Sequence, residues 1–335
     1  MAYGEGEGEG EGEGEGEGEG SSVGAGASFR GVPPGLGFRP WALDYTPNAT
    51  TDKPDLPAEI RTKLQPVPYA LDDWDPPLRA ISAVVEFAGH ASAWQGWQSS
   101  MVWKQGLAQT ATRLDDLQKK WMDANDLFVS NEINRLLRLM QDERARYMRE
   151  ILAQINGAPR YFLGLLDIAA NKKPWTRALL NYALRTGEFV ALHYKMVYQR
   201  PRPSTICAGL LSPFGPPAHP SLPSAHSLQS HLMALLLLEI PRIADRFGPN
   251  PTPTNDDTPL RLEDNEEDVQ PLSELLWLAG RIAKNRERAG LHYRSDTIAG
   301  RQLAVSTRRL MMTGYQASTW PAFKDLLVRA TAEWT

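Results

Sequence analysis

The 335-residue sequence has almost no cysteine, no long hydrophobic run and no strand-like pattern. A single cysteine, Cys207, excludes an intrachain disulfide and a cysteine-based zinc cluster. The longest apolar stretch, 232–238, is far below the ~18 residues that a membrane span needs. No segment alternates apolar and polar residues with the β-branched enrichment of a strand. These absences favour a soluble, all-α protein that does not associate with membranes.

The sequence also has little net charge. Its 36 basic and 40 acidic residues include eight glutamates in an alternating Glu-Gly run at 5–19, without which the chain is mildly basic. Nucleic-acid-binding domains are usually strongly basic, so we expect no nucleic-acid partner. At 42% hydrophobic residues the chain can build a sizeable core.

The first 80 residues differ in composition from the rest. Glu-Gly alternation offers no apolar face, so 1–37 is expected to be a disordered tail that aids solubility or serves as an acidic docking segment. Ten of the 26 prolines lie between Pro33 and Pro77, which predicts a Pro-rich extended arm over 38–80. The start lacks the basic and apolar regions of a signal peptide, which favours a cytoplasmic or otherwise soluble location.

Residues 81–335 are expected to form one all-helical catalytic domain with a bundle core. Apolar residues recur at spacings of three, four and seven through 133–152, and Gly157 and Pro159 should stop that helix. Further helices are expected at 83–103, 107–122, 160–170, 175–199, 225–239, 272–288, 295–315 and 321–333. Two Pro-rich connections, 201–223 and 241–259, interrupt the helices, and the first is flanked by His, Arg and Lys, as functional loops often are.

The first reactive cluster reads KMVYQRPRP over 195–203. Pro201 disfavours helix at the residue before it, which places Lys195 in a last helical turn and Arg202 in the following loop. Two such cations can bind an anion, or they can simply complement the negative end of the helix dipole. The local sequence leaves both interpretations open.

The second cluster reads HPSLPSAH over 219–226 and precedes an apolar helix. Ser224 is the expected N-cap, so the N–H groups of Ala225 and His226 would face an anion at the helix N-terminus. His226 could also transfer a proton near neutral pH. An ordinary helix cap beside a surface histidine would give the same pattern.

The third cluster reads RERAGLHYRSD over 286–296. Gly290 indicates a helix end, and a new helix should begin at or near Ser295. If His292 to Asp296 is helical, the four-residue spacing places imidazole and carboxylate side by side. The carboxylate would then fix which ring nitrogen carries the proton. A purely structural His–Asp pair is the alternative.

Together, Lys-x6-Arg-Pro, Pro-Ser-x-His and Arg-x5-His-x3-Asp follow in this order over 195–296. The combination resembles the three-part signature of the superfamily that joins the vanadium-dependent haloperoxidases to the type 2 phosphatidic acid phosphatases and bacterial acid phosphatases. The resemblance implies a helical bundle core of the vanadium haloperoxidase or acid phosphatase type with long Pro-rich loops. Two positions depart from the pattern: Ala225 stands where Gly is usual, and Asn285 where Ser often precedes the arginine.

The resemblance also implies roles for individual residues. The residues implied to bind the oxyanion, whether phosphate or vanadate, are Lys195, Arg202, Ser224, Ala225, Arg286 and His292. The residues implied to be catalytic are Lys195, His226, His292 and Asp296. In the phosphatases the third-motif histidine is the nucleophile and the middle-motif histidine protonates the leaving group; in the haloperoxidases the third-motif histidine, here His292, binds vanadium. His219, seven residues before His226, matches a second histidine of algal bromoperoxidases and is expected in a halide pocket, with an ordinary loop histidine as the alternative.

The resulting expectation is an oxidoreductase with vanadate as cofactor, which oxidises halide, preferably bromide, with hydrogen peroxide to hypohalous acid for a small organic acceptor. A soluble acid phosphatase acting through a phosphohistidine is the alternative. Leu192, where haloperoxidases typically carry Trp, favours that alternative, and the seven-residue step from Lys195 to Arg202 matches chloroperoxidases and phosphatases and not the algal enzymes. A protein that only sequesters the anion is a third interpretation. The organic substrate and the oligomeric state, a homo-oligomer included, stay open.

Overall fold

The computed structural model describes residues 107–123, 126–155, 158–169, 172–215, 217–248, 273–318 and 320–335. The expected tail at 1–37, the arm at 38–80, the helix at 83–103 and most of the second Pro-rich connection lie outside the described residues. The boundary expected at residue 81 is therefore not tested by the structure.

Within the described ranges every regular element is a helix, which confirms the all-α prediction. The elements are α5 (Ala108–Met122), α6 (Phe128–Leu139), η3 (Met140–Arg144), α7 (Ala145–Ala153), α8 (Ala158–Leu165), α9 (Pro174–Tyr198), α10 (Pro203–Ile206), η4 (Ala208–Leu210), α11 (Ala225–Leu237), α12 (Pro241–Phe247), α13 (Glu274–Arg288), α14 (Arg294–Gln316) and α15 (Pro321–Ala332). No helix in this part of the chain combines the length and the apolar character needed to cross a bilayer.

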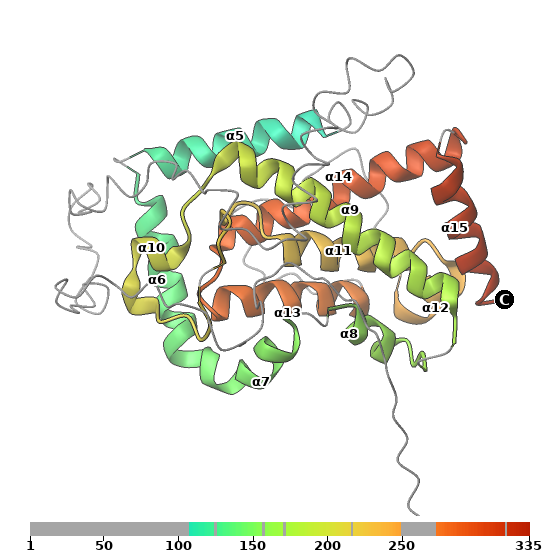
Figure 1. Cartoon of the computed structure of the whole chain (residues 1–335), viewed down its shortest axis with the longest axis horizontal. Helices are drawn as coiled ribbons and strands as arrows, with labels where there is room; N and C mark the ends of the chain where they lie inside the picture. Colours follow the sequence, from blue (N-terminus) through green and yellow to red (C-terminus); the bar gives the residue numbers. More distant parts are fainter. Residues whose placement is uncertain are drawn as a thin grey trace, which may run out of the picture.

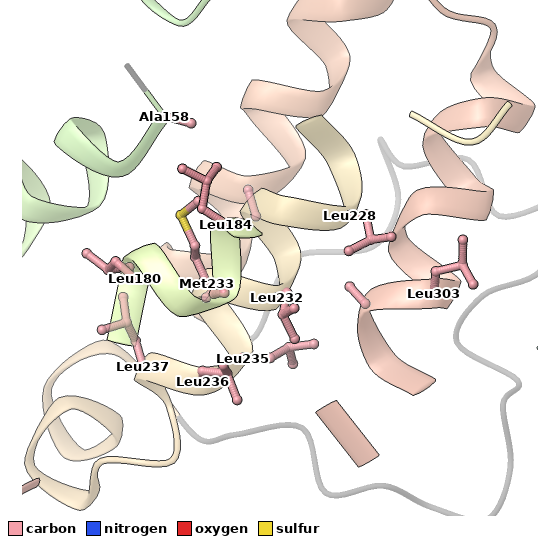
Figure 2. Close-up of a cluster of buried hydrophobic side chains, with 14 of the residues drawn as sticks. Ala158, Leu180, Leu184, Leu228, Leu232, Met233, Leu235, Leu236, Leu237 and Leu303 are labelled. Atoms are coloured by element: carbon pink, nitrogen blue, oxygen red, sulfur yellow. The ribbon is translucent and has the colours of Figure 1, made fainter. Parts of the chain in front are cut away.

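Helix α11 is the centre of the bundle and packs against α9, α13 and α14 (Figure 1). All of its residues are buried. Its second half is apolar on every side, as is typical of a helix in the centre of a core. Figure 2 shows Leu180 and Leu184 of α9 and Leu303 of α14 around this leucine-rich half. Burying one such leucine contributes about 2 kcal/mol. The apolar half of α11 thus anchors the bundle, while its first turn is left to carry polar side chains.

The helix expected through 133–152 is present but not uniform. It consists of α6, a single π-helical segment η3 and α7. Pro159 does not act only as a stop signal: it lies in the first turn of α8, where a missing N–H breaks no hydrogen bond. The helix expected at 160–170 therefore begins earlier and ends earlier than predicted.

Helix α9 is held at its first turn by the C-terminal end of the chain. The Glu333 carboxylate accepts hydrogen bonds from the backbone N–H groups of Trp175 and Thr176, at 2.8 and 2.9 Å. These are N–H groups that a helix start leaves without an intrahelical partner. The far end of α9 stops at Tyr198, where Gln199 adopts a left-handed φ of 45°. The helix thus spans the bundle and delivers Lys195 in its last turn to the polar end of α11.

Candidate active site

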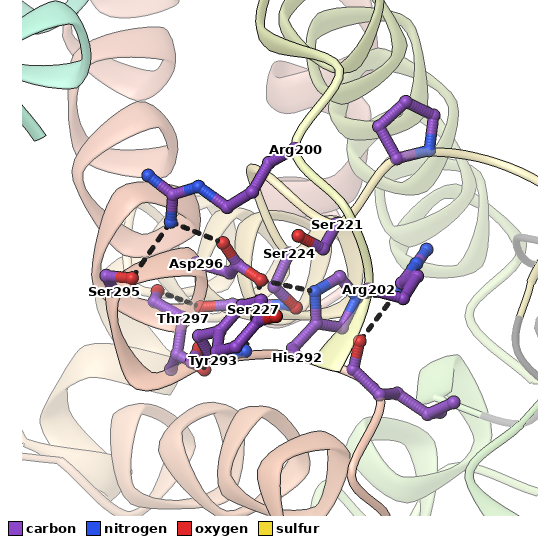
Figure 3. Close-up of polar contacts among 12 residues, drawn as sticks. Arg200, Arg202, Ser221, Ser224, Ser227, His292, Tyr293, Ser295, Asp296 and Thr297 are labelled. Carbon is purple, nitrogen blue, oxygen red and sulfur yellow. Dashed lines mark hydrogen bonds and ion pairs between the residues drawn. The ribbon is translucent and has the colours of Figure 1, made fainter. Parts of the chain in front are cut away.

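The three sequence clusters meet where α9 and α13 end and where α11 and α14 begin (Figure 3). The predicted site residues are all buried: Lys195, Arg202, His219, Ser224, Ala225, His226, Arg286, His292 and Asp296. Burying this many cations and imidazoles is costly unless they are hydrogen-bonded or paired. The contacts of each group therefore show what the site is built to do.

The first cluster reaches the other two through long basic side chains. Lys195 lies in the last turn of α9, as predicted, and its Nζ donates to the Pro220 carbonyl at 2.8 Å. Arg202 lies in the loop that follows, also as predicted. Its Nε donates to the His219 carbonyl and its Nη1 to the Leu291 carbonyl, both at 2.9 Å. These bonds tie the first cluster to the second and the third.

His292 and Asp296 lie side by side, but not as two residues of one helix. Helix α14 begins only at Arg294, after Gly290 has reversed the chain with a φ of +74°. The Asp296 carboxylate caps the helix start by accepting from the Tyr293 N–H at 3.1 Å. Its Oδ2 also lies 3.2 Å from His292 Nδ1. The helical arrangement considered from the spacing is therefore wrong, and helix capping produces the contact instead.

The partners of His292 define its tautomer. Arg202 Nη1 lies 3.0 Å from His292 Nε2, and a guanidinium can only donate. His292 Nε2 is therefore the acceptor, and the ring proton sits on Nδ1, directed at Asp296. Both a nucleophilic histidine and a metal-binding histidine need such a lone pair, and here it lies on Nε2.

A second arginine, which the sequence analysis did not select, contacts the same carboxylate. Arg200 Nη1 donates to Asp296 Oδ1 and to Ser295 Oγ, both at 2.9 Å (Figure 3). Burial by itself would raise the pKa of Asp296. The hydrogen bond with His292 and the charge of Arg200 outweigh that effect and hold the pKa below its ordinary value. Asp296 is thus an ionised carboxylate in the interior.

His226 and Arg286 both face the C-terminal end of α7. Arg286 Nη2 donates to the Ile151 carbonyl at 2.7 Å, and His226 Nε2 lies 3.2 Å from the Ile155 carbonyl. Because a carbonyl only accepts, His226 carries a proton on Nε2 in this contact. Both side chains are therefore oriented as donors, which is the role that an oxyanion and a leaving group require.

The start of α11 has the predicted cap. Ser224 Oγ accepts from the Ser227 N–H at 3.4 Å. Ala225 opens the helix and is not among the residues with positive φ, so an alanine in place of the usual glycine introduces no backbone strain. The Ser224 N–H donates to the Asp296 carbonyl at 3.0 Å, which joins the second cluster to the third.

The comparison with protein families agrees with the superfamily resemblance that the three clusters indicated. Residues 176–320, which include all three clusters, match the family model described as the PAP2 superfamily. The chain carries a PAP2-superfamily domain. This superfamily includes phosphatases and vanadium haloperoxidases, so the match does not distinguish between the two activities. No curated protein matches the chain significantly.

Two further residues support the PAP2 site from outside its motifs. The buried Glu132 carboxylate of α6 accepts from the backbone N–H groups of Arg294 and Ser295, at 2.8 and 3.1 Å. Burial first, then the charges of Asp296 and Glu287, raise the pKa of Glu132 to about 7. Nothing in the helical pattern around Glu132 distinguishes it from a solvent-facing glutamate, so the sequence offered no signal.

Gly300 is the other support of the PAP2 site. A Cβ at this position would lie 2.4 Å from the Ser224 carbonyl oxygen, far inside any allowed contact. Only glycine therefore lets α14 approach the start of α11 closely enough for Asp296 and Ser224 to meet. The residue lies in an ordinary helical stretch, where a close approach leaves no sequence pattern.

His219 lies against Arg202 and is not exposed on a surface loop. Its side chain is buried, and Nδ1 is 2.9 Å from Arg202 Nη2. A guanidinium only donates, so Nδ1 is the acceptor in this contact, and the same nitrogen lies 3.3 Å from the Pro220 carbonyl. Arg202 thus links two imidazoles of the PAP2 site, those of His219 and His292.

Proposed function

We propose that this protein is a vanadate-dependent haloperoxidase that oxidises bromide with hydrogen peroxide to hypobromous acid. The observation that carries the proposal is the pair of contacts from Arg202, 2.9 Å to His219 and 3.0 Å to His292. A phosphatase needs two imidazoles, a nucleophile and a proton donor, and His292 with His226 would supply both. A third imidazole held on the anion-binding arginine suits a site that must also handle a halide.

The residues present fit an oxyanion such as vanadate. Lys195, Arg202 and Arg286 are buried, and each donates a hydrogen bond to a backbone carbonyl. A tetrahedral or trigonal oxyanion would supply the negative charge that buried cations favour. These three side chains, with Ser224 Oγ and the Ala225 N–H, would bind its oxygens, and His292 Nε2 would bind the metal. Bound vanadate would supply Lewis-acid activation of hydrogen peroxide toward the halide.

The side chains of this chain divide the remaining work. Asp296 keeps the proton of His292 on Nδ1, so that Nε2 stays a lone-pair donor. Since Arg202 Nη1 contacts that nitrogen, occupation of Nε2 requires Arg202 to transfer its hydrogen bond from the ring to the anion. His226, with its proton on Nε2, acts as the general acid–base group, and such groups contribute ~10²–10⁴-fold to rate.

A soluble phosphatase is the second candidate, because of Leu192. This residue is fully buried in α9, at the position where haloperoxidases typically carry Trp. On this alternative the lone pair of His292 Nε2 attacks phosphorus, and His226 protonates the leaving group. The same arginines would bind the phosphate oxygens, so the geometry of the cradle serves both reactions.

The deciding experiment loads the full chain with orthovanadate and removes the excess. We expect bromination of an activated organic acceptor by bromide and hydrogen peroxide only after loading, and we expect phosphate to compete with loading. Elemental analysis measures retained vanadium, and His292→Ala serves as the control without the metal-binding nitrogen. Equal bromination by loaded and vanadate-free protein would contradict the proposal. Phosphomonoester hydrolysis by vanadate-free protein, with no bromination after loading, would establish the phosphatase instead.

A further inference from the structure

Arg200 is a fully buried arginine that the three motifs do not include. Its guanidinium makes directed contacts on two sides of the bundle. Nη1 donates to Asp296 Oδ1 and to Ser295 Oγ, both at 2.9 Å, and Nε donates to Gln118 Oε1 at 3.1 Å. Arg200 therefore connects α5 to the start of α14, immediately before the Pro201 turn that leads to Arg202.

The guanidinium of Arg200 also packs against an aromatic ring, which is itself supported by a second ring. Arg200 Cζ lies 4.6 Å from the centre of the Trp121 ring, and this ring packs edge-on against Tyr293 at 4.5 Å between ring centres. A planar guanidinium can stack on a ring and donate along its edge at the same time, whereas a lysine ammonium cannot. The position of Arg200 is thus set independently of Asp296, which lets Arg200 act as the fixed partner of the pair.

The contact with Arg200 divides the two oxygens of Asp296 between two tasks. Oδ1 accepts from Arg200, while Oδ2 accepts from His292 Nδ1 at 3.2 Å and from the Tyr293 N–H at 3.1 Å. Turning the carboxylate away from His292 would break the charge-assisted bond to Arg200. The arginine therefore restrains the carboxylate in the one orientation that directs Oδ2 at the imidazole.

The charges around this contact make Arg200 necessary. Asp296 and Glu132 are both buried carboxylates, and both interact with the charge of Arg200. Tyr293 at the N-cap of α14 and His292 in the turn before it also face this cluster, and Glu287 faces Glu132 from α13. Removing one partner of a buried ion pair leaves the other charge uncompensated. Without Arg200, Asp296 would lose its principal counter-charge.

We propose that Arg200 is a positioning residue of the active site, which acts through Asp296 to keep the proton of His292 on Nδ1. The inference rests on the proposed function only in taking His292 as the reacting residue. The inference predicts the tautomer of His292 in the resting protein. This tautomer can be measured whether the protein halogenates, hydrolyses phosphate or does neither.

The first test therefore reads the tautomer itself. Histidine-¹⁵N-labelled full chain, free of vanadate, is compared with Arg200→Gln and Arg308→Gln by ¹⁵N–¹H spectroscopy of the rings, and the His292 signal is assigned by its loss in His292→Ala. Arg308 is a suitable control because it lies on α14, the helix that carries Asp296, and pairs with the carboxylate of Glu239. We expect the Nδ1–H tautomer in wild type and in Arg308→Gln. In Arg200→Gln we expect a mixture of both tautomers, because the Arg202 contact at Nε2 then opposes the shift alone. An unchanged His292 signal in Arg200→Gln would overturn the proposal.

The second test measures coupling to Asp296 in whichever reaction the protein catalyses. Changing the partner of an oriented histidine typically costs 10–100-fold, so we expect Arg200→Gln to lower kcat by about that factor with little change in KM. In the Asp296→Asn background the same substitution should cost almost nothing further, because its target is already altered. Full additivity of the two losses would contradict an effect through Asp296.

Folding is checked by circular dichroism and thermal unfolding of each variant. If Arg200→Gln does not fold, Arg200→Lys carries both tests, because it keeps the charge but not the planar fork. We then expect an intermediate loss of kcat and a mixed tautomer at His292. Wild-type kcat and a wild-type His292 signal in Arg200→Lys would show that the fork is not needed and would contradict the proposal.

Discussion

Arg200 and Arg202 are two residues apart and equally buried, but they act on different nitrogens of the His292 ring. Arg200 donates to the carboxylate that holds Nδ1, and its charge is balanced inside the protein by Asp296. Arg202 donates to Nε2 of the same ring and to Nδ1 of His219. We call these the carboxylate side and the anion side of the site. The comparison shows that burial does not define the role of an arginine, whereas the charge of its partner does.

The two sides therefore make different demands. On the carboxylate side, buried charges of both signs already compensate one another, so that its function is to hold geometry. On the anion side, Lys195 and Arg202 donate to backbone carbonyls, and a bound oxyanion would place negative charge beside these buried cations. Substitutions on the two sides should consequently affect different measurable quantities.

The largest effect should come from the ring that both sides share. His292→Ala removes the only atom proposed to bind the metal or to attack phosphorus, so we expect activity to fall by more than ~10³-fold and vanadium retention to disappear. His226→Ala should retain the anion and lose ~10²–10⁴-fold in turnover. Elemental analysis after desalting and steady-state turnover measure the two quantities. Identical vanadate affinity in wild type and His292→Ala would show that the two histidines have been assigned the wrong roles.

The next effect distinguishes the two arginines. Arg202→Lys removes a forked donor from the anion side, and we expect orthophosphate to bind ~10²-fold more weakly, since truncating such a buried contact costs 2–5 kcal/mol. Arg200→Lys lies on the carboxylate side and should weaken phosphate binding much less. Isothermal titration of vanadate-free protein with orthophosphate compares them. Equal losses of affinity in the two variants would remove the distinction between the sides.

A pH effect on stability should arise on the carboxylate side. Glu132 has its pKa raised to about 7 in the folded chain, against 4.5 as the reference value. The folded state therefore binds this proton more tightly, so the stabilisation is complete below pH 4.5 and is lost as the pH rises through 7. The difference corresponds to about 3 kcal/mol. Urea unfolding measures the free energy of unfolding between pH 5 and 7. We expect this free energy to decline less steeply with pH in Glu132→Gln than in wild type. An unchanged slope would contradict the prediction.

The smallest effect is expected at His219 on the anion side. His219→Phe removes the acceptor for Arg202 Nη2 but leaves the contact of Arg202 with His292. We expect a change of a few-fold, on the order of the ~1 kcal/mol of one hydrogen bond, in the KM for bromide or in halide preference, with vanadate affinity nearly intact. Bromide and chloride kinetics are measured across about pH 5 to 8, which brackets the ~6.5 reference pKa of imidazole. Unchanged kinetics would make His219 a bystander.

Much of the fold and several local features of the site could be predicted from residues close together in the sequence. Helical periodicity predicted the all-α architecture, and Pro201 correctly predicted that Lys195 lies in the last turn of a helix and Arg202 in the loop that follows. Ser224 caps α11 as expected. The spacing of His292 and Asp296 predicted their contact but suggested a helix where the structure has a cap. In that case the pairing was right because several local conformations bring such residues together.

The residues that were missed owe their roles to distant partners. Arg200 is 96 positions from Asp296, and Glu132 is more than 160 positions from the two N–H groups that it caps. Gly300 matters only because α14 lies against the start of α11. No local pattern records such contacts, because each depends on where another helix happens to pass.

The sequence by itself determined that the described part of the chain is helical and, to within a few residues, where most of its helices lie, because turns, caps and periodicity depend on neighbours within a few residues. Only the tertiary structure decided which nitrogen of His292 keeps its lone pair and which of the two arginines pairs with Asp296. Those properties depend on hydrogen-bond partners and local charge in a buried environment. Packing of α5, α6, α11 and α14 creates that environment, and it exists only after the chain has folded.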